Sequence, residues 1–383
     1  MGDTFDAIVL GLGGVGSAAA CHLAGRRRRT LGIEQFQPAH DRGSSHGGSR
    51  IIRQAYHEHP DYVPLVRRSY ELWRELEHNT GSELLTITGG LLIGPENGEV
   101  VQGALRSARQ HLVPHELLSP PDIRRRFPLF HAGEGEAGLF EGTAGFLRPE
   151  RAVRAHLQQA ANAGADLHFG EAVTQWSATP GGGVSVTTDR GTYEAESLIL
   201  APGAWAPEVM GALGLPLVIR RHMMCWFDPI ADAPLFSPEH FPIYLWQSSS
   251  GTILYGFPAI DGPHGGAKAA IHTGGEICSP DTLERGLLPK DEEEIREQLS
   301  SLLPALNGPL LHSSACMYTL TPDEHFLLGP HPQWPQVTIA CGFSGHGFKF
   351  CSVLGEILAD LAATRMTRHS VEFLSPARFQ ARG

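Results

Sequence analysis

Lysine is nearly absent from this chain of 383 residues, in which only Lys268, Lys290 and Lys349 occur among 30 basic residues. Arginine is the usual cation. A lysine that persists against this bias indicates a place for a compact, titratable ammonium that a planar guanidinium could not replace. Lys290 lies in the acidic helical stretch PKDEEEIRE, where solvated pairing along a helix explains it. Lys268, in GGAKAAIHTGG, and Lys349, in GFSGHGFKF, need another explanation.

A positively charged surface is also missing, because 41 acidic residues outnumber the 30 basic ones and the formal net charge is −11. The one basic run, GRRRRT at residues 25–30, ends a helical stretch, where positive charge suits the carboxyl end of the helix dipole. We therefore expect no nucleic-acid partner.

Paired cysteines are lacking as well. None of the six cysteines forms a CxxC pair or a zinc-like spacing, which argues against a disulfide framework or a structural metal. The HEH stretch at residues 57–59 has two alternating histidines in a loop, and we expect no metal site there.

Four glycines interrupt the apolar amino terminus, and its arginines follow the apolar run. We therefore expect neither an export signal nor a membrane span, and a cytoplasmic location.

The first 36 residues have the strand, helix and strand pattern of a dinucleotide site. Their glycines Gly11, Gly13 and Gly16 stand in the GxGxxG spacing, with Gly14 between them, and Glu34 ends the second strand. The glycines allow a tight turn and the close approach of a pyrophosphate to a helix amino terminus, while the carboxylate accepts hydrogen bonds from ribose hydroxyls. The motif predicts a dinucleotide and leaves both FAD and NAD open.

Further pieces of the same domain come from the middle and the end of the chain. Alternating residues flank an Asp-Arg-Gly turn and lead to a buried strand at 198–200. A strand at 337–340 precedes the glycine-rich stretch GFSGHGFKF and an apolar helix with Lys349 in its first turn. We predict an α/β (α+β) fold in which a discontinuous Rossmann-like domain carries a second domain with a mixed sheet. A substrate cavity is expected where the two domains meet.

Four residues have the character of site residues. Arg50 and Arg53 are three residues apart and are predicted to share one side of a helical turn, as a fork for a carboxylate; two surface arginines are the alternative. Lys349 stands where a helix dipole disfavours a cation, which indicates a nearby anion, unless the side chain reaches solvent. Cys316 has small polar neighbours, but a lone cysteine is more often a small buried hydrophobic residue.

The pieces SHGGSRIIRQAY, YGFP, ACMYT, DEHF and GFSGHGFKF, in this order and at these distances, closely resemble the monomeric sarcosine oxidase and N-methyltryptophan oxidase family. That family belongs to the D-amino-acid-oxidase-like FAD oxidoreductases, and the resemblance spans essentially the whole chain. It implies a Rossmann-like FAD-binding domain formed by residues 1–85, 146–220 and 323–383, and a substrate domain formed by 86–145 and 221–322.

The resemblance also implies roles for particular residues. FAD would be attached covalently through Cys316, and the other implied cofactor contacts are Gly11, Gly13, Gly14, Gly16, Glu34, Ser44, Arg50, Gly345, Gly347 and Lys349. Arg53 and Lys349 would hold the substrate carboxylate. Lys268 would lie over the flavin face where oxygen reacts, near Arg50. Tyr255 and His272 match positions that line the family's substrate cavity and would act in catalysis, and Tyr318 is their neighbour by analogy and would bind substrate; the implied roles of all three are orientation and hydrogen bonding. This chain has Ser45 and Gly48 where the family often has a histidine and an acidic residue, and Gln54 where a histidine is common.

The implied activity is oxidative demethylation of sarcosine or a related N-methyl amino acid by O2, which gives an aldehyde, an amino acid and hydrogen peroxide. The expected partners are the amino-acid substrate and O2, and the chain is expected to act as a monomer. A bulkier or cyclic substrate, such as N-methyltryptophan, pipecolate or proline, is the alternative within enzymes. A flavin-binding protein without turnover is the alternative outside them.

Overall fold

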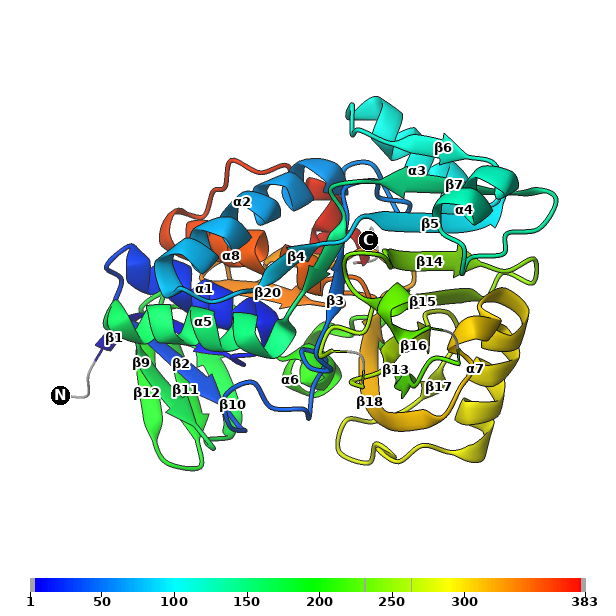
Figure 1. The fold of residues 1–383 in the computed structure, drawn as a ribbon. Helices are drawn as coiled ribbons and strands as arrows, with labels where there is room; N and C mark the ends of the chain where they lie inside the picture. The colour runs from blue at the N-terminus through cyan, green and yellow to red at the C-terminus, as the bar shows by residue number, and fades with distance from the viewer. Residues whose placement is uncertain (1–3, 231, 263, 380–383) are drawn as a thin grey trace.

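Two large mixed sheets lie side by side in the computed structural model, which describes residues 4–230, 232–262 and 264–379 (Figure 1). A third, three-stranded sheet contains β3 (Arg50–Ile52), β8 (Gly145–Leu147) and β4 (Leu85–Ile87), with β8 in the centre. Within the described residues, no helix has both the length and the apolar character needed to cross a membrane.

The first sheet has eight strands and lies at the left of Figure 1, beneath a layer of helices. Its path runs β10, β11, β12, β1, β2, β9, and β20 pairs with both β12 and β19. The strands are β1 (Thr4–Leu10), β2 (Thr30–Glu34), β9 (Asp166–Phe169), β10 (Val173–Ala178), β11 (Val184–Thr188), β12 (Thr192–Leu200), β19 (Leu327–Pro330) and β20 (Val337–Cys341). The predicted strand, helix and strand at the amino terminus and the two later strands are confirmed. β1 lies between β2 and β12 and pairs in parallel with both.

Three helices lie on this sheet, α1 (Gly14–Gly25), α5 (Pro149–Asn162) and α8 (Cys351–Thr364), and a fourth, α2 (Tyr62–Thr80), packs against α5 and α8. They bury a common apolar core that includes Leu23, Val63, Val153 and Ile357. α1 and α8 approach so closely that a Cβ at Gly355 would overlap Ala18. An early helix and a late helix of the chain are therefore in direct contact.

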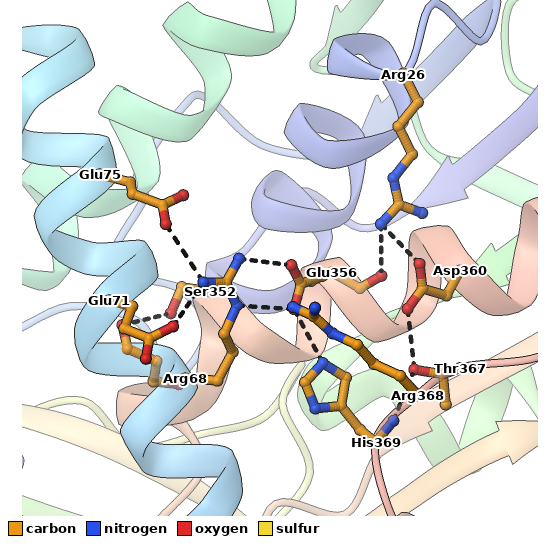
Figure 2. Close-up of polar contacts among 11 residues, drawn as sticks. Arg26, Arg68, Glu71, Glu75, Ser352, Glu356, Asp360, Thr367, Arg368 and His369 are labelled. Carbon is orange, nitrogen blue, oxygen red and sulfur yellow. Dashed lines mark hydrogen bonds and ion pairs between the residues drawn. The ribbon is translucent and has the colours of Figure 1, made fainter.

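A buried carboxylate fastens α8 to its neighbours (Figure 2). Glu356 of α8 accepts hydrogen bonds from Arg68 of α2 at 2.8 and 3.1 Å and is 2.9 Å from Nε2 of His369 in the carboxyl-terminal segment. Arg26, just after α1, forms an ion pair with Asp360 at 2.8 Å. Burial alone would raise the pKa of Glu356, but His369 and Arg68 hold it below its ordinary value. This cluster joins three helices and the carboxyl-terminal segment.

The second sheet has nine strands and lies at the right of Figure 1. Its path runs β17, β13, β16, β15, β14, β5, β7, β6, and β18 pairs with β13. The strands are β5 (Gly90–Pro95), β6 (Glu116–Leu118), β7 (Glu136–Glu141), β13 (Val218–Phe227), β14 (Ile243–Gln247), β15 (Ile253–Phe257), β16 (Ala267–Ile271), β17 (Glu276–Ile277) and β18 (Leu310–Leu320). The remaining helices are α3 (Glu99–Gln110), α4 (Pro120–Arg126), α6 (Ala206–Val209) and α7 (Pro289–Leu302). Because β13 begins at Val218, it crosses the predicted domain boundary at residue 220, and the division into two domains stays a prediction.

Candidate active site

The turn between β1 and α1 has no room for side chains at two glycines. Gly11 has a φ of +85°, and a Cβ there would overlap the carbonyl oxygen of Ala201, while a Cβ at Gly16 would overlap the carbonyl oxygen of Gly11. Glu34, at the end of β2, is 6% exposed and accepts hydrogen bonds from the amides of Leu12 (2.9 Å) and Phe36 (3.1 Å). A close-packed backbone beside a fixed carboxylate is what a dinucleotide needs.

One cavity of about 980 Å³ is lined both by this turn and by the side chains in which the sequence predicts chemistry. Its lining includes Gly11, Gly13, Gly14, Glu34, Ser44, Arg50, Arg53, Tyr255, His272, Cys316, Tyr318, Gly345, Gly347 and Lys349. The volume lies at the upper end of the range of about 300–1,000 Å³ for small-molecule sites. These residues fit FAD: the turn and Glu34 suit its nucleotide, and the cavity continues past them to Cys316.

Arg50 and Cys316 lie together in this cavity. Nη2 of Arg50 is 3.5 Å from Sγ of Cys316 and donates to the carbonyl of Ser44 at 2.9 Å. Arg50 begins β3, so the prediction that it shares a helical turn with Arg53 is wrong. Antiparallel pairing with β8 extends the backbone of residues 50–52, and Arg53 follows directly after the strand. Arg53 therefore shares no helical turn with Arg50.

Arg53 is buried, at 1% exposure, and already has an anionic partner. Its Nη2 lies 2.8 Å from Oε2 of Glu58 and 2.8 Å from Nδ1 of His57. Burial lowers the pKa of His57 to about 3, so the imidazole is neutral and leaves Glu58 as the counter-ion. Sequence analysis missed this role, because it weighed the HEH stretch only as a metal site. The acidic residue five positions after Arg53 was the available signal.

Lys349 lies in a 3-10 turn, Phe348–Phe350, just before α8, rather than in the first turn of that helix as predicted. Glycines precede Lys349, and the backbone forms this 3-10 turn before the regular α-helix begins. Its Nζ donates to the carbonyl of His346 at 2.8 Å and is 3.5 Å from the hydroxyl of Tyr56. Burial, with Arg53 nearby, lowers the pKa of Lys349 to about 7. This side chain therefore titrates in the neutral range.

Aromatic side chains form another part of the wall. The hydroxyl of Tyr318 lies 3.3 Å from Nδ1 of His272, and the rings of Tyr255 and His272 meet edge to face at 6.1 Å. Burial lowers the pKa of His272 to about 4, so it is neutral near pH 7. A Cβ at Gly345 would overlap the ring of Tyr318, which explains a glycine beside that tyrosine.

Lys268 is 1% exposed and is not among the cavity-lining residues. Its Nζ donates to the carbonyls of Gly47 and Ser49, both at 2.8 Å, and lies 4.1 Å from the ring centre of Phe257. The carbonyl of Ser49 also accepts from Arg50 at 2.9 Å, so one oxygen joins the buried lysine to a cavity-lining arginine. Burial and the charge of Arg50 lower the pKa of Lys268 well below its usual range.

The DAO family model, described as FAD dependent oxidoreductase, matches residues 6–361. The chain belongs to this family. FAD, rather than NAD, is therefore the dinucleotide, and the predicted family resemblance is confirmed.

Two curated relatives of this FAD-dependent oxidoreductase are similar over their whole length. It is 49% identical to the monomeric sarcosine oxidase of Streptomyces avermitilis, with 100% of this chain and 99% of that protein covered. It is 34% identical to the N-methyl-L-tryptophan oxidase of Yersinia pestis (strain Pestoides F), with 98% and 100% covered. Among solved structures, the open form of NikD, an unusual amino acid oxidase essential for nikkomycin biosynthesis, has a TM-score of 0.83 at 26% identity and covers 98% of each chain. The predicted fold class is confirmed.

Proposed function

We propose that this chain is an FAD-dependent oxidase that acts on the CH–NH bond of sarcosine or a related N-methyl amino acid and passes the electrons to O2. One observation carries the proposal: a single cavity joins the nucleotide turn to Cys316 and to the buried cations Arg53 and Lys349. The names of the relatives support the same substrate class.

The substrate carboxylate would bind between Lys349 and Arg53. Lys349 has a donor left after its bonds to His346 and Tyr56, because an ammonium has three. Arg53 is engaged by Glu58, so the carboxylate reaches it only by joining or displacing that side chain. Neutral His272 and Tyr318 can orient the amine by hydrogen bonding without adding charge.

The amine must be the free base, since its lone pair assists the departure of hydride from the adjacent carbon. When bound, FAD supplies the two-electron acceptor that is later reoxidised by O2. The N-methyl amino acid loses two electrons and two protons to become an imine, which water converts to formaldehyde and the demethylated amino acid. O2 gains two electrons and two protons and becomes hydrogen peroxide. Lys268 and Arg50 would stabilise negative charge on the reacting oxygen.

We also propose that FAD is bound covalently through Cys316, that the two large sheets belong to the two predicted domains, and that the protein acts as a monomer in the cytoplasm. The word monomeric in the relatives' names supports the monomer. The position of Cys316 in the cavity beside Arg50 supports the attachment.

Anaerobic mixing of the flavin-loaded protein with sarcosine, N-methyltryptophan, pipecolate and proline in turn tests the function. We expect sarcosine to bleach the flavin, and air to restore the colour with one peroxide for each flavin. Bleaching by a bulky or cyclic amine alone would keep the proposed reaction and show that the substrate is that amine rather than sarcosine. Bleaching by none would contradict the oxidase and favour a flavoprotein without turnover.

Carboxylate binding should depend on pH through Lys349. The lysine is charged below its pKa of about 7, so binding of an anion is strongest there and weakens as pH rises. We expect the Kd of a carboxylate without an amine, such as propionate, to be constant below pH 7 and to rise about tenfold per unit above it. Titration followed by the flavin spectrum measures this.

Lys349→Arg is the matched control, because its guanidinium does not titrate in this range. The pH dependence should disappear in that variant and persist in Lys290→Met, where the lysine is exposed and forms an ion pair with Glu276. A wild-type Kd that stays constant up to pH 9 would remove Lys349 from the carboxylate site.

A further inference from the structure

The loop before β3 connects Lys268 to a carboxylate on the opposite side. Lys268, on β16, donates to the carbonyl oxygens of Gly47 and Ser49, both of the main chain. The position of its ammonium is therefore set by the direction in which these two peptide groups point. What fixes the loop also fixes the lysine.

Two consecutive glycines give this loop its shape. Gly47 and Gly48 have φ values of +91° and +73°, in the left-handed region that other residues seldom adopt. Both amides point at Glu150: the Gly47 amide donates to Oε1 at 2.6 Å, and the Gly48 amide to Oε1 at 3.1 Å and Oε2 at 3.3 Å. Consecutive amides turned to one side form a concavity that binds an anion. Here the anion is a side chain of the protein, and Gly48 stands where the resembled family often has an acidic residue.

The helix that carries Glu150 is held in place independently. Glu150 follows Pro149 in the first turn of α5, where the helix dipole favours a carboxylate. The preceding Arg148 bonds Asp261 and the carbonyl of Ile260, both at 2.7 Å, in the segment between β15 and β16. The contacts of Arg148 thus link the start of α5, which carries Glu150, to the segment that precedes β16, which carries Lys268.

The charges around Lys268 add an electrostatic effect to this geometry. Lys268 and Arg50 are two cations that share the carbonyl of Ser49. The groups that act electrostatically on Lys268 are Arg50 on β3, Cys316 on β18, and Arg148 and Glu150 at the start of α5, and Lys268 itself acts on His312 of β18. Burial, Arg50 and Arg148 lower the pKa of Lys268 and favour the neutral amine, whereas Glu150 first and then Cys316 favour the ammonium.

We propose that Glu150 is a positioning residue for Lys268: it orients the Gly47 and Ser49 carbonyls through the loop amides and places a negative charge close to the two basic side chains, Lys268 and Arg50. This inference rests on the proposed function, in which a charged Lys268 promotes the reaction of reduced flavin with O2. The effect of Glu150 on the titration of Lys268 can be measured without enzyme turnover.

The scarcity of lysine makes that measurement direct. Protein labelled with ¹³C at the lysine Cε gives signals from three lysines, which lysine-to-arginine variants assign. Glu150→Gln keeps a hydrogen-bond acceptor and removes the charge. We expect the pKa of Lys268 to fall by about one unit in this variant, with Lys290 and Lys349 unchanged. Glu99→Gln is the matched control, because it removes the first-turn carboxylate of another helix, α3, without touching the loop.

Stopped-flow kinetics supply the second readout. In the pH range where Lys268 titrates, Glu150→Gln should slow reoxidation about tenfold, the rate factor that corresponds to one pKa unit, and change anaerobic reduction less than twofold. An unchanged Lys268 titration, or equal slowing of both half-reactions, would overturn the proposal. A shifted titration with unchanged reoxidation would uphold the link to Glu150 and refute the oxygen role of Lys268. If Glu150→Gln fails to fold, Glu150→Asp keeps the charge one methylene further away, and a smaller shift in the same direction is expected.

Discussion

Lys268→Met is expected to slow reoxidation of the reduced flavin by about 100- to 1,000-fold, the effect of removing one preorganised electrostatic contact. Reduction of O2 begins with negative charge on oxygen, and a buried ammonium fixed by two carbonyls needs no reorganisation when that charge appears. Methionine fills a similar volume without charge. Stopped-flow mixing of substrate-reduced protein with aerated buffer measures the rate.

Anaerobic reduction by substrate should change only severalfold in Lys268→Met, since the proposed substrate contacts lie on Arg53, Lys349, His272 and Tyr318 rather than on Lys268. Lys290→Met serves as the control, because Lys290 is exposed and pairs with Glu276 at the surface. A reoxidation rate equal to that of the wild type would remove Lys268 from the reaction with oxygen.

Cys316→Ser is expected to abolish covalent attachment of FAD. Acid-precipitated wild-type protein should stay yellow, whereas the variant should release its flavin into the supernatant. Cys316 lines the cavity, lies 3.5 Å from the guanidinium of Arg50, and supplies the sulfur proposed to attack the flavin. A serine hydroxyl is a far weaker nucleophile. Absorbance of pellet and supernatant measures the distribution of flavin.

Cys351→Ser is the matched control for this experiment, because Cys351 also lines the cavity and is buried. Its flavin should stay with the pellet. Loss of colour from the wild-type pellet, or release of flavin by Cys351→Ser in place of Cys316→Ser, would contradict the assignment.

The parts of the fold that sequence predicted are those that local patterns determine. The turn after β1 needs glycines whatever surrounds it, and the buried strands of the first sheet are short apolar runs bounded by turn residues. Arg50 was misplaced for the opposite reason. Whether its segment forms a helical turn or a strand is decided by pairing with β8, nearly 100 residues later in the chain, and no local pattern reports that partner.

Side-chain partners were the least predictable part of the site. Cation positions could be read from the bias against lysine, but their counter-ions could not. Glu58 lies in the HEH stretch, which was considered only as a metal site, and Glu150 has the local setting of an ordinary first-turn acid of a helix. The role of each carboxylate depends on a contact that exists only in the folded chain. Glu58 pairs with Arg53, and Glu150 accepts from the Gly47 and Gly48 amides.

The pairing of the first sheet has a consequence for biosynthesis. β1 is a central strand, yet its neighbour β12 is made about 190 residues later, and the segment 345–349 that completes the cavity follows later still. A nascent chain therefore leaves one edge of apolar β1, the edge not paired with β2, open until β12 has been made, the kind of edge that chaperones shield. FAD can enter its complete site only after residues 345–349 have been made, so binding of the vitamin-derived cofactor must follow the synthesis of β1 and β12 rather than guide their pairing.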